Sequence, residues 1–383
     1  MNKKLLVSRI FNDTGDWFYY FVIVVIIYTM NKSPVMMGIL SASYTIPGIL
    51  VSKKLAELID RLDDRKALIM FDGLRIFVLS GIVFTNNIWL ALLCVFLEQI
   101  FAIGSNLAFQ RVTLDVITDS QKLLVFNRQL KIFSNGSRLL VIPSYLIMHQ
   151  FISNKLILGL DILFTLISLI ETIKIKVNPL QVPFKGETNE CKLEKLRFGN
   201  KITKTIVIFS LLNLFRAFVD AYGIMYISNT SKNVNFGYAM LVFILSIADL
   251  IGGIVSKKII KKSNIDQNSI LIFSFINILI LFSIPSIIHN MECFIGCIFL
   301  LRLGLSILEL FVLYRLQLYA PQKIHQYIAL QTMLIDGVSL INSILGGVII
   351  QKINIFNYMN IIILIVLVSG IFFGCIQNKK RPD

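Results

Sequence analysis

The sequence predicts an all-α protein that crosses a membrane many times and consists of two similar halves. Hydrophobic residues make up 56% of its 383 residues and charged residues only 15%, whereas an ordinary soluble domain is about 25% charged. The segment Val51–Leu55 recurs as Val255–Ile259, at an offset of 204 residues. The same offset aligns Phe11 with Phe215, Asp16 with Asp220, Glu98 with Arg302, and Arg111 with Arg315. A repeat in so apolar a chain is typical of a membrane transporter.

Six apolar stretches in the first half are long enough to cross a bilayer, which requires about 20 mainly apolar residues. Lys3 and Lys4 precede the first stretch as they would in a signal peptide. Asp13 and Asp16 interrupt that stretch and no small-residue cleavage site follows, so we interpret it as a membrane helix. Polar turns at 31–34 and 86–87 set two of the boundaries. The expected helices are 5–30, 34–58, 66–86, 88–110, 122–148 and 153–175.

The second half contains six further apolar stretches. A long polar segment with Pro179, Pro183 and Gly186 separates them from the first six, and we interpret it as a cytoplasmic linker. The expected helices are 202–228, 234–256, 268–288, 291–314, 323–350 and 353–377. We therefore expect twelve transmembrane helices in two pseudo-symmetric bundles, 1–175 and 202–383, joined by the linker 176–201.

The basic residues indicate how these helices are oriented. The net charge of +15 would also suit a nucleic-acid-binding protein. When both termini are placed in the cytoplasm, most Lys and Arg residues fall on the cytoplasmic side. The basic residues left outside are Lys32, Lys155, Lys232 and Lys352. This bias follows the positive-inside rule, so we expect a multi-pass protein of a bacterial cell membrane with cytoplasmic termini, a lipid bilayer around it and no nucleic-acid partner.

Two local motifs resemble a known family. The segment 56–66 reads Ala-Glu-Leu-Ile-Asp-Arg-Leu-Asp-Asp-Arg-Lys, and Asp72 and Arg75 follow it in the third expected helix. The first helix carries Gly-Asp-Trp at 15–17 and ends before Ser-Pro at 33–34. These segments resemble the loop signature and the first helix of the major facilitator superfamily, in its macrolide, multidrug and siderophore exporter branch.

The resemblance implies two six-helix bundles that alternate in access, with helices 1, 4, 7 and 10 lining a central cavity. It also implies that charges near the loop form a cytoplasmic gate, in which Asp60 acts with Arg111 and with the start of helix 11 near Lys323. The alternative is that these charges only obey the positive-inside rule. The expected gate residues are Asp60, Arg61, Asp64, Arg65, Asp72, Arg75 and Arg111.

Charged residues inside the expected helices are the strongest local signal, because each costs about 3 kcal/mol on insertion scales unless it faces a cavity or a partner. Most of them fall on the four helices that the resemblance assigns to the cavity. We expect the proton or substrate cavity to contain Asp13, Asp16, Trp17, Glu98, Arg216, Asp220, Arg302, Glu309 and Asp336.

Three hypotheses concern how these charges are used. Asp16 has no evident partner nearby in the sequence, so we expect a proton or cation site there, with a structural hydrogen bond to helix 5 as the alternative. Arg216 and Asp220 are four residues apart and either pair within their helix or face the cavity. Glu98 and Arg302 occupy equivalent positions in the two halves, so we hypothesise that they pair across the cavity.

These observations favour a secondary active transporter that exports a hydrophobic or amphiphilic small molecule, with proton coupling. Two alternatives stay open: a nutrient or lipid importer, and a membrane sensor or immunity protein with a transporter fold. The second stays open because the helix 5 antiporter motif of the resembled family normally carries Gly-Pro, whereas this chain has Ile142-Pro143. We expect no enzyme activity, no cofactor and no metal site, since no cluster of His or carboxylate accompanies Cys293 and Cys297. We expect a monomer.

Overall fold

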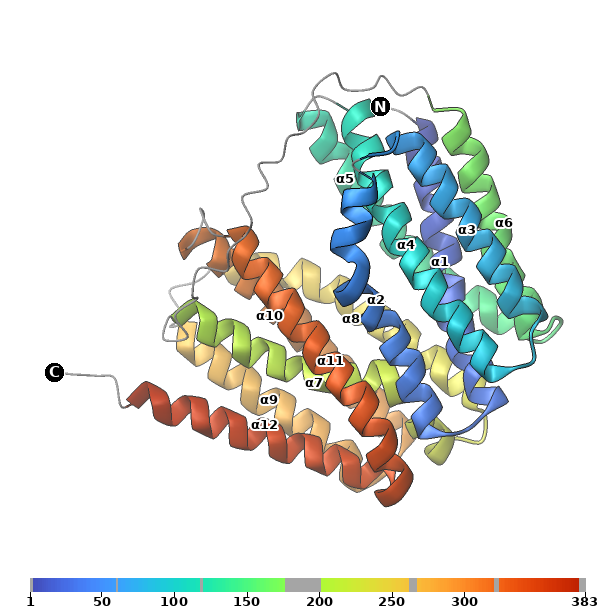
Figure 1. The fold of residues 1–383 in the computed structure, drawn as a ribbon. Coiled ribbons are helices and arrows are strands. Elements are labelled where there is room, and N and C mark those ends of the chain that lie inside the picture. Colours follow the sequence, from blue (N-terminus) through green and yellow to red (C-terminus); the bar gives the residue numbers. More distant parts are fainter. Residues whose placement is uncertain are drawn as a thin grey trace. The chain divides into compact units, whose positions relative to one another are not determined.

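The computed structural model describes residues 3–59, 61–117, 120–175, 201–261, 267–319 and 324–378, and the regular structure in these residues is helical. The chain divides into two compact units, Met1–Lys185 and Gly186–Asp383. Figure 1 draws the first unit in blue to green and the second in yellow-green to red. The all-α fold expected from the apolar composition is confirmed. Most of the expected linker, residues 176–200, lies outside the described residues.

The first unit contains helices α1 to α6, and their order follows the apolar stretches of the sequence. Asp63 caps the start of α3, because its side chain accepts a hydrogen bond from the Lys66 backbone N–H at 2.9 Å. Asn87 caps α4 in the same way. The bounds are α1 Lys3–Met30, α2 Pro34–Ile59, α3 Asp64–Phe84, α4 Ile88–Val116, α5 Ser120–Met148 and α6 Asn154–Ile173.

The second unit contains helices α7 to α12. Two of its turns are closed by residues in the left-handed region, His289 with φ 41° and Asn354 with φ 82°, residue types that tolerate this conformation better than most. The bounds are α7 Lys201–Thr230, α8 Val234–Lys261, α9 Gln267–Ile288, α10 Met291–Tyr319, α11 Ile324–Ile353 and α12 Ile355–Asn378.

The two units share one packing pattern. In the first, α1 packs against α5 and α6, α4 against α2 and α3, and α3 against α6. In the second, α7 packs against α11 and α12, α10 against α8 and α9, and α9 against α12. Each contact in the first unit therefore has its counterpart six helices later. This correspondence supports the duplicated half inferred from the offset of the sequence repeat.

Several helices are longer than the apolar stretches that predicted them. The helix expected over 88–110 runs to Val116, and the one expected over 291–314 runs to Tyr319. Hydropathy marks the part of a helix that lies in hydrocarbon, whereas backbone hydrogen bonding continues into the polar interface. The described residues contain nine helices long and apolar enough to span a membrane, and shorter apolar segments in α9 and α12. The total of twelve spans stays a prediction.

Burial identifies a central helix in each unit. In the most apolar stretch of α1, 67% of the residues are buried, and in that of α7 72% are buried. The corresponding share is 28–44% in the other helices that are long and apolar enough to span a membrane. Most of the surface of α1 and of α7 is therefore covered by other helices of the same unit. A polar residue that is buried on either helix therefore lies against a neighbouring helix of its own unit.

Candidate functional site

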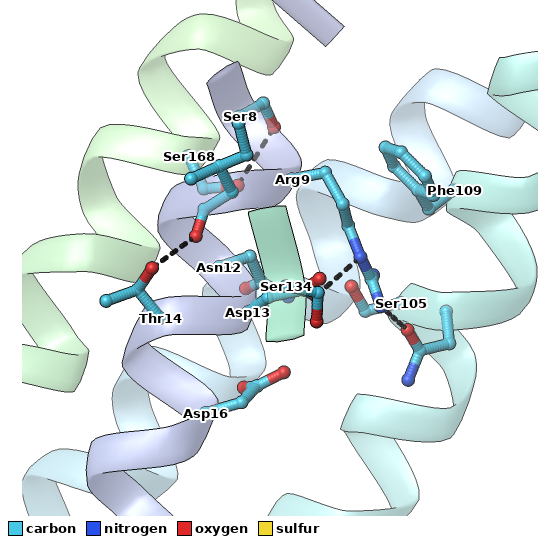
Figure 2. A network of polar contacts seen from close by, with 12 residues as sticks. Ser8, Arg9, Asn12, Asp13, Thr14, Asp16, Ser105, Phe109, Ser134 and Ser168 are labelled. Atoms are coloured by element: carbon cyan, nitrogen blue, oxygen red, sulfur yellow. Dashed lines mark hydrogen bonds and ion pairs between the residues drawn. The ribbon is translucent and has the colours of Figure 1, made fainter. Parts of the chain in front are cut away.

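A row of polar residues runs along one face of α1. Asn12 and Asp13 lie three and four residues after Arg9 and four and three residues before Asp16, so the four residues share a helix face. Figure 2 shows this row turned towards neighbouring helices. Asn12 is 4% exposed and Asp13 8% exposed. The sequence therefore places two buried polar groups and two adjoining charged groups inside an otherwise apolar unit.

Arg9 is held at the start of this row by two helices. Its Nε lies 2.7 Å from Oδ1 of Asp13, and its NH2 group donates to Oδ1 of Asn106 on α4 at 2.5 Å. The guanidinium also lies over the ring of Phe109, 4.9 Å from the ring centroid. Asp13 in turn contacts Ser134 of α5. The Arg9–Asp13 ion pair lies within α1. Arg9 connects it to α4, and Asp13 connects it to α5.

Arg75 of α3 is the centre of the buried polar network, at 1% exposure. Its Nε donates to Oε1 of Glu98 at 3.0 Å, and its NH1 group donates to Oδ1 of Asn12 at 3.0 Å. Its NH2 group pairs with Asp16. One guanidinium therefore joins α1, α3 and α4. Asp16 does have a partner, on α3, a helix that neither of the two readings of this residue had named.

The expected gate residues separate into two groups. Asp72 and Arg75 belong to the buried network, since Asp72 is 1% exposed and accepts a hydrogen bond from the Ser105 hydroxyl at 2.6 Å. The loop group lies at the start of α3, where NH1 of Arg111 is 3.5 Å from Oδ1 of Asp64. Arg65 donates to the Ile175 carbonyl at 2.9 Å.

The loop group is described only in part. Arg61 is exposed, whereas Asp60 and Lys323 lie outside the described residues. The pairing of Asp60 with Arg111 and with the start of helix 11 therefore stays a prediction.

Asp161 of α6 was missed in the sequence, although it is 0% exposed. Its Oδ1 accepts a hydrogen bond from Thr165 at 3.3 Å. The cost of burying a charge, which singled out the other acids, applies equally to this acid in the middle of an apolar helix. It could have been found by the same rule applied to every helix rather than mainly to those assigned to a cavity.

In the second unit, Arg302 of α10 pairs with Asp249 of α8. Nε of Arg302 lies 2.7 Å from Oδ1 of Asp249, and its NH2 group lies 2.9 Å from Oδ2. The Ser306 hydroxyl donates to the same carboxylate at 2.7 Å. The hypothesis that Glu98 pairs with Arg302 was wrong, because each residue has a partner within its own unit. Asp249 was not among the expected residues.

The other charges of the second unit are more exposed. Arg216 and Asp220 pair within α7 at 3.4 Å, with side chains 40% and 56% exposed, so the intrahelical alternative is confirmed. Glu309 is exposed, and Asp336 is half-buried with Arg216 as its charged neighbour. Charged residues this exposed inside apolar helices face either a water-filled cavity or the interface.

The aromatic residues that follow Asp16 in α1 contact several neighbouring helices. Trp17 lies under the guanidinium of Arg138 from α5, whose central carbon is 4.5 Å from the ring centroid. The Tyr20 hydroxyl donates to Gln99 at 3.2 Å, and the Tyr20 ring packs on Tyr44 of α2 with centroids 5.1 Å apart. The aromatic run of α1 is therefore divided between contacts with several helices of its unit.

A sequence model described as Major Facilitator Superfamily matches residues 5–341. No curated protein sequence matches the chain significantly. A crystal structure of a mutant of the nucleoside transporter NupG superposes with a TM-score of 0.80 at 11% identity, covering 97% of this chain and 98% of that one.

Two further solved structures superpose over almost the whole chain. An inward-facing bacterial homologue of the human lysosomal transporter Spinster superposes with a TM-score of 0.71 at 10% identity, covering 97% of this chain and 95% of that one. A bacterial homologue of the iron transporter ferroportin superposes with a TM-score of 0.70 at 16% identity, covering 99% of this chain and 98% of that one. At these identities the likeness shows the fold.

Proposed function

The chain belongs to the Major Facilitator Superfamily, and from this premise we propose that it exports a hydrophobic or amphiphilic small molecule in exchange for protons. It is a multi-pass membrane transporter of the alternating-access type. Export, the substrate class and the coupling ion are the proposed parts. We further propose bundles over 1–175 and 202–383, cytoplasmic termini, a cell-membrane location and a monomer.

The observation that carries proton coupling is the excess of acids in the buried network of the first unit. Its cations are Arg9, Arg75 and the adjoining Arg138. Its acids are Asp13, Asp16, Asp72, Glu98 and Asp161. Buried ionised groups that lack a counter-charge are strongly unfavourable. Protons are the simplest neutralising species, and their binding and release would change the ion pairs that join α1, α3 and α4.

Asp16 is the acid best placed to exchange a proton with the cavity. Its side chain is 19% exposed, against 1% for Glu98, and both pair with Arg75. Protonation of Asp16 would release one arm of Arg75 and weaken the link between α1 and α3. Trp17 and Tyr20 adjoin this position, so a lipophilic cation that enters would find both a negative charge and aromatic surface. Export rather than uptake rests on the resemblance of segments 15–17 and 56–66 to the exporter branch.

Efflux of a lipophilic fluorescent cation from energised cells tests this function. Efflux should require the intact protein, collapse when a protonophore is added, and be lost in Asp16→Asn. The control is Glu171→Gln on α6, which removes a surface pair with Lys174 and should leave efflux unchanged. Accumulation in place of efflux would mean import. No movement of a broad panel of such cations would favour the sensor or immunity reading, and efflux that survives in Asp16→Asn would exclude Asp16 as the coupling residue.

A further inference from the structure

Asp161 occupies the tightest contact between α1 and α6. A Cβ atom added to Gly15 would overlap Oδ1 of Asp161 and would lie 3.2 Å from Cβ of Phe164. The carboxyl group is therefore pressed against the α1 backbone at a position that requires glycine. It is 0% exposed, so it cannot exchange a proton with water directly in this conformation.

The hydrogen bonding of Asp161 is incomplete. Its Oδ1 receives one long bond of 3.3 Å from Thr165, and its Oδ2 has no hydrogen-bond partner among the described residues. A buried ionised carboxylate normally accepts two or three strong hydrogen bonds or pairs with a cation. The Thr165 hydroxyl can donate to a carboxylate or accept from a carboxylic acid, so it suits either protonation state.

Three acids compete for one cation at this position. The charged groups facing Asp161 are Asp16 from α1, Arg75 from α3 and Glu98 from α4. The guanidinium of Arg75 donates to Asp16, Glu98 and Asn12. With all three acids ionised, the group would carry two uncompensated negative charges in the membrane interior, where unpaired charges are strongly unfavourable. Asp161 is the acid that lacks a hydrogen bond from Arg75.

We propose that Asp161 stores a proton and passes it to Asp16, with Arg75 changing partner between them. The O–H bond of the Asp161 carboxyl breaks as an O–H bond forms on the Asp16 carboxylate. Arg75 then pairs with ionised Asp161 in place of neutral Asp16, so the charge of the group does not change. Asp16, which is partly exposed, exchanges the proton with water. This relay rests on the proposed proton coupling and adds an internal proton site to it.

Infrared spectroscopy of the purified protein in detergent tests the relay without requiring transport. A protonated carboxyl group gives a C=O stretch above the amide I band that shifts in D2O. At neutral pH the wild type should show such a band, and Asp161→Asn should lose it. Glu171→Gln, on the same helix, should keep it. Asp16→Asn should also lose it, since Arg75 is then free to pair with ionised Asp161.

Two results would overturn the proposal. A band that is unchanged in Asp161→Asn would mean that Asp161 is ionised in the wild type. A band that persists in full in Asp16→Asn would mean that its proton does not depend on the partner of Arg75. If Asp161→Asn does not fold, persistence of the full band in Asp16→Asn still overturns the proposal, since Asp161 is intact in that variant. The infrared result does not depend on efflux, so the band is expected even if the protein does not export in exchange for protons. Absence of the band would overturn the relay but would leave proton coupling through Asp16 alone intact.

Discussion

Replacing Gly104 by alanine should loosen the contact between α3 and α4 that holds the buried network together. A Cβ atom at this position would lie 2.6, 2.6 and 2.8 Å from three ring atoms of Phe71. Phe71 is 2% exposed and belongs to the hydrophobic core of the first unit, so its ring cannot move away without displacing other side chains. The neighbouring residues Ser105 and Asp72 form a hydrogen bond across the same interface.

The magnitude follows from comparison with Gly73→Ala. Carbon atoms pack best at about 3.5–4.0 Å, so the Phe71 ring must retreat by about 1 Å, and overpacking of this kind costs about 1–3 kcal/mol. A Cβ atom at Gly73 of α3 would meet nothing within 4 Å. Both changes gain about 1 kcal/mol of helix propensity, which cancels between them. Gly104→Ala should therefore be less stable than Gly73→Ala by about 1–3 kcal/mol.

Tryptophan fluorescence measures this difference in the relevant unit. The chain has two tryptophans, and Trp17 and Trp89 both lie in the first unit. In thermal melts in detergent, the midpoint of Gly104→Ala should lie below that of Gly73→Ala by about 2–4 °C for each kcal/mol. Equal midpoints would refute the reasoning, because they would mean that the Phe71 ring moves aside without cost.

Two further predictions concern the ion pairs. Arg75→Met should destabilise the first unit by about 3–5 kcal/mol, because it leaves Asp16 and Glu98 buried without their cation; a midpoint of tryptophan fluorescence equal to that of the wild type would contradict this. Asp249→Asn should cost about 1.5–3 kcal/mol, since it breaks the two-armed bond to Arg302. Asp220→Asn, whose pair is exposed, should cost less than about 1 kcal/mol. Retention of a monodisperse peak after heating compares these two variants, and equal losses would mean that exposure does not distinguish the pairs.

The candidate site could be predicted in composition but not in its contacts. The cost of a charge in an apolar helix singled out Asp13, Asp16 and Glu98 from the sequence. The predicted pairing of Glu98 with Arg302 came from the sequence repeat and was wrong, because equivalent positions in two halves need not be neighbours in space. Each residue took a partner from an adjacent helix of its own unit, Arg75 in one case and Asp249 in the other.

The sequence by itself determined the helices, their order and the duplication, because apolar length and the offset of Val51–Leu55 to Val255–Ile259 are properties of the chain alone. The tertiary structure decided that Arg75 joins Asn12, Asp16 and Glu98, and that Asp161 is pressed against Gly15. Helical periodicity fixes which residues share a face of one helix. It does not fix how neighbouring helices are rotated against each other. That rotation is set by side-chain packing over the whole unit, and it decides which acid pairs with each arginine.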